Sequence, residues 1–137
     1  MDDTYTRLLV AYDGSDPAGR ALERAADLAG LAQVTVLTVF PASFTSLGPV
    51  PPPQEDVEKA RGRLEDATRF LRGRGVNARG EATLGDPAKE ILDEAARRAI
   101  DLIVAGSHGK RFAERVLVGS VSAKVVAHAH CDVLVVR

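Results

Sequence analysis

The residues best suited to chemistry lie in a glycine-rich segment, Gly106-Ser107-His108-Gly109, and in the pair Gly119-Ser120 further along the chain. Together they form the pattern G-x2-G-x9-G-S. Glycine allows close approach of a ligand and a positive φ, which we expect at Gly106 and Gly109. Free N–H groups at a helix start attract anions, and Ser120 adds a hydroxyl donor. The pattern predicts a phosphate site, distinct from a P-loop, since no G-x4-G-K-[ST] occurs in the chain.

A second candidate is Asp13, which directly follows the apolar run 8–11 and Tyr12. A carboxylate at the carboxyl end of a strand accepts hydrogen bonds from a ribose or holds Mg²⁺. The alternative is an N-cap for the next helix, but Ser15 or Asp16 already serves that purpose. We therefore favour a ligand role for Asp13.

The segment His128-x-His130-Cys131 resembles a metal cluster, but residues two apart on a helix face different directions. Histidine also suits a helix C-terminus because of the helix dipole. We predict no metal site here, and an ordinary thiol rather than a nucleophile at Cys131. His108 either polarises a phosphate or shapes its loop, and we favour the second role.

The elements that position these residues follow from the apolar pattern. Short apolar runs without alternation, typical of strands covered on both faces, occupy residues 8–11, 34–40, 102–105 and 133–136. Residues 76–84 alternate with polar side chains, which predicts an edge strand or one with a solvated face. Apolar stripes at helical spacing begin near Ala21, Val57, Ile91 and Val121.

Helix starts are marked by Asp16-Pro17 and Asp86-Pro87, each read as an N-cap followed by proline. Strands alternating with helices predict an α/β fold with a mainly parallel, doubly wound sheet in one domain, 1–137. Residues 41–53 hold five of the seven prolines and form either a stiff surface loop or a flap over the strand ends. Ligands of such sheets bind at the carboxyl ends of the strands.

Composition narrows the function. The 18 basic and 19 acidic residues give a net charge of −1, which argues against a nucleic-acid or anionic-lipid surface. Four Phe, two Tyr and no Trp make base-stacking platforms improbable. A single cysteine excludes an internal disulfide. An acidic N-terminus and short apolar runs lead us to expect a cytoplasmic protein without a membrane span.

The chain resembles the universal stress protein family from about Tyr5 to Arg137. The resemblance is carried by residues 9–15, Gly85-Asp86-Pro87, residues 101–109, residues 118–121 and residues 133–136. It implies five strands in the order 3-2-1-4-5. The complete glycine pattern is that of the family's ATP-binding branch, so the resemblance implies ATP, with or without Mg²⁺, as the ligand.

Carried over by position, the resemblance implies a nucleotide site of ten residues. Asp13 would lie near the ribose and Val39 against the adenine. The adenosine end would be formed by Ala11 and Tyr12, and the floor beneath the nucleotide by Ala105 and Gly106. The phosphates would be surrounded by Gly109, Gly119, Ser120 and Val121.

The resemblance also implies a homodimer. The last strand, Val133-Leu134-Val135-Val136, is an apolar edge, and family members cover it with the same strand of a second subunit. The leading hypothesis is an ATP-binding regulatory protein of the stress response, with an unidentified protein partner. Two alternatives stay open: a slow ATP hydrolase or nucleotidyl-transfer enzyme, and a dimeric scaffold that needs no nucleotide. No fast phosphoryl-transfer machinery is evident, so we assign no catalytic residue.

Overall fold

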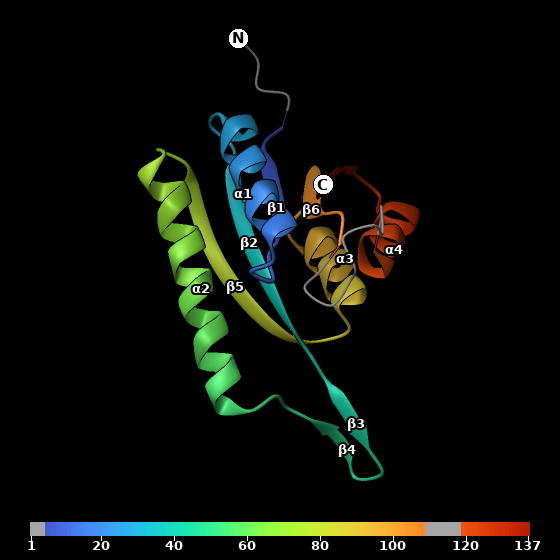
Figure 1. Ribbon diagram of the computed structural model, residues 1–137. Helices are drawn as coiled ribbons and strands as arrows, with labels where there is room; N and C mark the ends of the chain where they lie inside the picture. The colour runs from blue at the N-terminus through green and yellow to red at the C-terminus, as the bar shows by residue number, and fades with distance from the viewer. Residues whose placement is uncertain (1–4, 109–118) are drawn as a thin grey trace.

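The structure of the protein is a computed structural model, which describes residues 5–108 and 119–137. Strands and helices alternate along most of the chain (Figure 1). In chain order they are β1 (Arg7–Ala11), α1 (Asp16–Ala29), β2 (Gln33–Pro41), β3 (Ser43–Thr45), β4 (Gly48–Val50), α2 (Gln54–Gly73), β5 (Asn77–Gly85), α3 (Pro87–Arg97), β6 (Leu102–Gly106), α4 (Ser120–His128) and β7 (Asp132–Val136).

The main sheet has five parallel strands in the order β5-β2-β1-β6-β7. Counting only these five strands along the chain, the order is 3-2-1-4-5, so the predicted fold class and order are confirmed. The alternating strand β5 lies at one edge, as its pattern predicted, and β7 lies at the other. The winding reverses between β1 and β6, which are neighbours.

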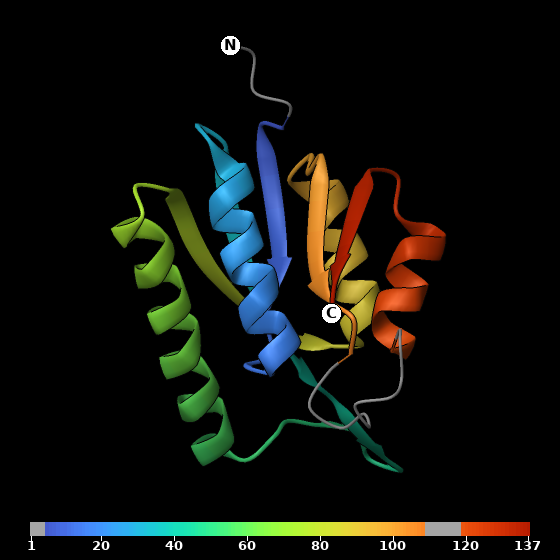
Figure 2. The same cartoon turned by 45° about the horizontal axis from the view of Figure 1, so that its top comes forward.

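Helices cover both faces of the sheet (Figure 2), and an apolar core lies on each face. On one face, Leu8 and Val10 of β1 pack with α1 and α2. On the other face, Leu9 packs with Leu37, α3 and Val125 of α4. Neighbouring β1 residues therefore serve opposite cores, which explains why the central strands read as unbroken apolar runs.

The helix starts agree with the sequence at α3 and differ at α1. Asp86 caps α3, since its carboxylate accepts the N–H of Lys89 at 3.0 Å. For α1 the N-cap is Ser15, whose hydroxyl accepts the N–H of Ala18, and not Asp16 as the Asp-Pro pair predicted. Asp16 is instead the first helical residue, where its charge suits the helix dipole.

The proline-rich stretch 41–53 is more ordered than the predicted loop. It contains a small antiparallel hairpin, in which Ser43 pairs with Val50 and Thr45 with Gly48. The hairpin continues from the end of β2 and projects beyond the carboxyl edge of the sheet (Figure 1). Gly48, at φ 112°, adopts a backbone conformation at the turn that other residues rarely reach.

Candidate functional site

A cavity of about 350 Å³ opens at the carboxyl ends of the central strands, where the winding reverses. This volume lies at the lower end of the range for small-molecule sites. Ten of its lining residues come from the three strands β1, β2 and β6 or directly follow them, namely Ala11, Tyr12, Asp13, Leu37, Thr38, Val39, Phe40, Pro41, Ala105 and Gly106. The cavity is therefore a product of the sheet topology.

Eight of the ten residues implied by the sequence line this cavity: Ala11, Tyr12, Asp13, Val39, Ala105, Gly106, Gly119 and Val121. They come from four different parts of the chain. Ser120 is not among the lining residues and has an exposed side chain at the first position of α4. Gly109 lies outside the described residues.

Val39 presents backbone groups to the cavity. The β1–β2 ladder ends at the pair Ala11–Leu37, and the N–H of Tyr12 donates to the Leu37 carbonyl at 2.9 Å. Backbone groups of a strand alternate in direction, so Val39, two residues after Leu37, directs its N–H and C=O toward the same side. Beyond the end of β1 that side belongs to the cavity, where the Val39 N–H offers a donor and the Val39 C=O an acceptor to a ligand.

The backbone of Tyr12 is fully engaged at the cavity wall. Besides its bond from the N–H to Leu37, its carbonyl accepts the Thr38 hydroxyl at 2.9 Å. Burial raises the pKa of the Tyr12 phenol, and Arg63 opposes that shift only in part. The phenol is therefore neutral near pH 7 and can act as a hydrogen-bond donor.

Asp13 has one carboxylate oxygen engaged and one available. Its Oδ1 accepts the N–H of Ser15 at 2.9 Å, which forms a local turn before α1. Ser15, and not Asp13, caps the helix. Oδ2 has no hydrogen bond to any described residue, and the residue lines the cavity, so this oxygen is free to accept from a ligand hydroxyl.

The N-terminus of α4 borders the cavity at Gly119 and Val121. Gly119 is the N-cap, and no described side chain accepts a capping hydrogen bond there. Instead the N–H of Gly119 donates to the Ser107 carbonyl at 2.5 Å, and the Ser122 hydroxyl donates to the same carbonyl at 3.0 Å. The N-terminus of α4, which carries the positive end of the helix dipole, therefore borders the cavity.

Gly106 has a packing role that the sequence did not reveal. Its φ is not positive, contrary to the expectation for this glycine. A Cβ at this position would lie 2.8 Å from Cβ of Pro17 and 2.9 Å from the backbone nitrogen of Ala18. Glycine is needed here because the start of α1 packs directly on the end of β6.

Several lining residues were missed by the sequence reasoning. They are Ser15, Ala18, Leu37, Thr38, Phe40, Pro41, Ala60, Pro87, Ile91 and Ser122. Phe40 and Pro41 follow Val39 directly, so their place at a strand end was a usable signal. Ala60 lies in the middle of a helix stripe and Pro87 marks a helix start, and neither pattern indicates a cavity. His108 lines the cavity, with Nδ1 3.1 Å from the Ser107 hydroxyl.

Residues 5–108 and 119–137 contain no group of three or more His, Cys, Asp or Glu side chains arranged to hold a metal ion. No helix in those ranges is both long and apolar enough to cross a membrane. The cytoplasmic location expected from the sequence stays a prediction.

Fold and site together define a doubly wound α/β domain with a ligand cavity at the topological switch point. Comparison with known proteins gives the family. A sequence model of the universal stress protein family matches residues 4–137. The universal stress protein YxiE of Bacillus subtilis is 34% identical over 97% of this chain and 99% of its own. The chain belongs to the universal stress protein family.

Solved structures of universal stress proteins share the fold of this chain. The universal stress protein UspA from Lactobacillus plantarum has a TM-score of 0.81 and 32% identity, covering 99% of this chain and 100% of its own. The universal stress protein from Archaeoglobus fulgidus, solved in complex with dAMP, has a TM-score of 0.71 and 27% identity. The match covers 97% of this chain and 98% of its own.

Proposed function

We propose that the protein is an ATP-binding regulatory protein of the stress response that works as a homodimer. The observation that carries the nucleotide part is the convergence of eight sequence-implied residues on one cavity of about 350 Å³. The related protein from Archaeoglobus fulgidus binds dAMP, which supports an adenine nucleotide as the ligand class.

The cavity has an apolar part suited to the base and sugar. Val39, Phe40 and Ile91 offer apolar surface to a purine ring. The outward N–H and C=O of Val39 match the acceptor and donor on the Watson–Crick edge of adenine. Asp13 Oδ2 accepts from a ribose hydroxyl, while Ala11 and Tyr12 line the adenosine end and Ala105 and Gly106 lie beneath the nucleotide.

The phosphates would lie toward α4. Gly119 and Val121 line the cavity, and the helix N-terminus offers uncapped amides to an anion. Ser120, exposed beside them, can donate its hydroxyl to a phosphate that extends past the cavity rim. Gly109 completes this set in the proposal.

Mg²⁺, if it accompanies ATP, has few protein ligands here. Asp13 is the one carboxylate among the residues that line the described cavity. The ion would therefore be held chiefly by phosphate oxygens and water, with Asp13 as a single protein ligand. One carboxylate without a described arginine in the lining does not make a fast phosphoryl-transfer site, which favours a binding role over an enzymatic one.

The dimer would form through β7. Its residues Val133–Val136 are each half-buried within the isolated chain, although they belong to an apolar strand. An edge of this kind is covered when it pairs with the same strand of a second copy around a two-fold axis.

The test is nucleotide content followed by calorimetry. Freshly purified protein is denatured, released nucleotides are identified by chromatography, and ATP, ADP and AMP are titrated into stripped protein. We expect Asp13→Asn to weaken ATP binding by about tenfold, the effect of losing one charged hydrogen bond. The amide oxygen still accepts the Ser15 N–H, so the local turn is kept. Asp16→Asn, at a neighbouring aspartate that is also exposed but lies outside the cavity lining, is the matched control.

The alternatives give different results. Sustained ATP turnover that is lost in Asp13→Ala while binding persists would favour the hydrolase or nucleotidyl-transfer enzyme. Absence of both bound nucleotide and ATP affinity would overturn the proposal and leave the nucleotide-independent scaffold.

A further inference from the structure

A second cavity, of about 360 Å³, lies at the opposite end of the sheet from the nucleotide cavity. Its walls are the first residues of β1 and β2, the end of α3 and the turn into β6. The six lining residues are Arg7, Gln33, Thr35, Arg97, Arg98 and Ile100. Three carry guanidinium groups and none is acidic. We propose that this cavity binds a small molecule that carries a phosphate group.

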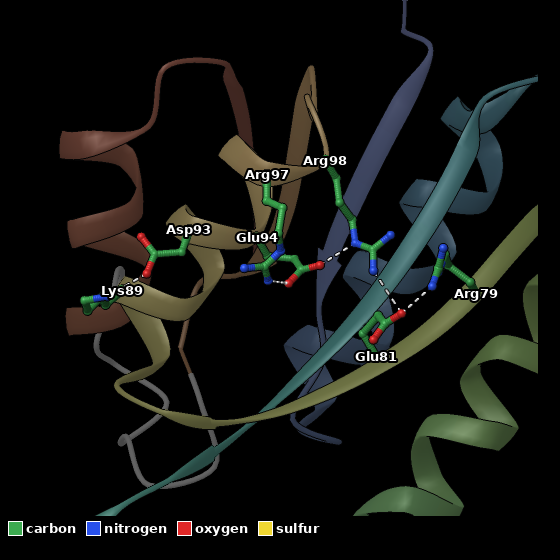
Figure 3. Close-up of polar contacts among 7 residues, drawn as sticks. All are labelled: Arg79, Glu81, Lys89, Asp93, Glu94, Arg97 and Arg98. Carbon is green, nitrogen blue, oxygen red and sulfur yellow. Dashed lines mark hydrogen bonds and ion pairs between the residues drawn. The ribbon is translucent and has the colours of Figure 1, made fainter.

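The charge of the lining supports an anionic ligand. Arg97 and Arg98 each pair with Glu94, and Arg98 also contacts Glu81 at 2.9 Å (Figure 3). Neither Glu94 nor Glu81 is among the lining residues of the cavity. Each guanidinium has five N–H donors, so both arginines keep donors for a ligand while the carboxylates hold their side chains in place.

Arg7 adds an uncompensated charge. Its backbone N–H donates to Asp101 Oδ1 at 2.9 Å, which fixes the start of β1. Its guanidinium makes no ion pair with any residue in the described ranges. Asp101 is otherwise taken up by Thr6, whose N–H and hydroxyl both donate to Oδ2. The nearby carboxylate is thus occupied by the backbone, and the side chain of Arg7 is left for the cavity.

Thr35 gives an independent sign of a ligand. It is only 3% exposed and lines the cavity, yet its hydroxyl has no hydrogen bond to any residue among 5–108 and 119–137. Every fully buried side-chain oxygen or nitrogen in those ranges does have a partner. The Thr35 hydroxyl therefore retains contact with the open space, as a polar group at the floor of a cavity walled by guanidinium groups.

The end of α3 does not oppose an anion strongly. The N–H groups of Ala99 and Ile100 donate to the carbonyls of Ala96 and Ala95, closing the last turn in a Schellman arrangement. These carbonyls are satisfied within the chain, which reduces the negative potential of the helix end. Guanidinium groups bind phosphate oxygens in a bidentate geometry, so a phosphate group fits this lining better than a neutral ligand.

The experiment is an amide NMR titration with pyrophosphate at constant ionic strength, because each cavity has its own reporters. We expect saturable changes in the amide chemical shifts of Thr35, Arg98 and Ile100, which line the second cavity. This expectation does not depend on the signals of Gly119 and Val121, which line the nucleotide cavity. A parallel titration with inorganic phosphate shows whether one phosphate group suffices. If the nucleotide proposal is wrong, only the signals of Gly119 and Val121 are affected, so the two proposals fail separately.

Variants test whether the lining residues of the second cavity bind pyrophosphate. Arg7→Gln and Arg97→Gln should each weaken pyrophosphate binding at Thr35 by about tenfold. Thr35→Val removes a hydroxyl that has no hydrogen-bond partner in the described ranges, and it should weaken binding without loss of fold. Arg24→Gln, an exposed arginine of α1 outside both cavities, is the matched control. The proposal would be overturned if the chemical-shift changes were confined to Gly119 and Val121. It would also be overturned if Arg7→Gln and Arg24→Gln lost the same affinity for pyrophosphate.

Discussion

The N–H of Ser107 donates to the carbonyl of Val136 at 2.6 Å, and this bond joins the loop after β6 to the last residue of β7. The Ser107 carbonyl in turn accepts from Gly119 and Ser122 at the start of α4. One buried residue therefore connects the rim of the nucleotide cavity with the proposed dimer edge. A displacement of α4 by a ligand would reach β7 through a single residue, Ser107.

The same bond defines which β7 residues face outward. Since the Val136 carbonyl points toward β6, alternation directs the backbone of Val135 toward the open edge. Val135→Pro removes an outward N–H and leaves the bonds to β6 in place. We expect a dimer for the wild type and a folded monomer for this variant, measured by sedimentation with circular dichroism as the fold check. Val135→Thr keeps the N–H and should stay dimeric; a dimeric Val135→Pro would contradict pairing through β7.

Gly106→Ala should destabilise the fold. The added Cβ would meet Cβ of Pro17 at 2.8 Å and backbone atoms of α1 at 2.9 Å, and backbone cannot move aside as a side-chain tip can. We expect a loss of about 1–3 kcal/mol in the free energy of unfolding, measured by urea denaturation. Gly19→Ala, a helical glycine whose Cβ would meet nothing within 4 Å, should instead stabilise the protein. Equal stability of Gly106→Ala and wild type would refute the packing role.

Ala99→Gly should stabilise the fold. Ala99 is the non-glycine residue with positive φ, 53°, in the described chain, and it terminates α3. The left-handed conformation costs a non-glycine residue about 1–2 kcal/mol, and glycine's entropy offsets part of the relief. A net gain of about 0.5–1 kcal/mol is expected in urea denaturation. Ala96→Gly, exposed in the preceding turn with ordinary helical geometry, should lose about the same amount.

Glu94 should contribute stability that depends on pH. Burial raises the pKa of this carboxyl, but hydrogen bonds from Arg98 and Arg97 outweigh burial and leave the pKa below its usual 4.5 (Figure 3). A lowered folded pKa means that the contribution is complete above 4.5 and disappears as pH falls through the folded value. Glu94→Gln should therefore cost about 1–3 kcal/mol at pH 7 and progressively less in acid.

The control for Glu94 lies one residue away. Asp93 pairs with Lys89 at 2.6 Å on the exposed side of α3, where solvent screens the pair (Figure 3). Asp93→Asn should change the unfolding free energy by less than about 0.5 kcal/mol. A difference between wild type and Glu94→Gln that stays constant from pH 7 to pH 3 would show that the ion pairs do not stabilise the fold.

The strands could be predicted because burial leaves a local record in the sequence, whereas their order was implied by the family resemblance. Residues 8–11 and 102–105 are apolar without interruption because each strand faces a core on both sides, and β5 alternates because one of its faces is solvated. The cap of α1 was harder to predict, since Ser15 and Asp16 are adjacent and both can cap a helix. Only the backbone conformation of Ser15, with ψ 163°, places it outside the helix.

The sequence by itself determined the alternation of strands and helices, because apolar runs and glycine spacing are local properties. Its resemblance to the family implied eight residues that prove to share a cavity. The tertiary structure alone decided that Ala60 of α2 lines this cavity and that a glycine is required at position 106, where α1 packs. It also brought Arg7 and Arg97 together around Thr35. These relations depend on how crossovers fold helices back over a twisted sheet, and residues so far apart in sequence carry no local signal of their proximity.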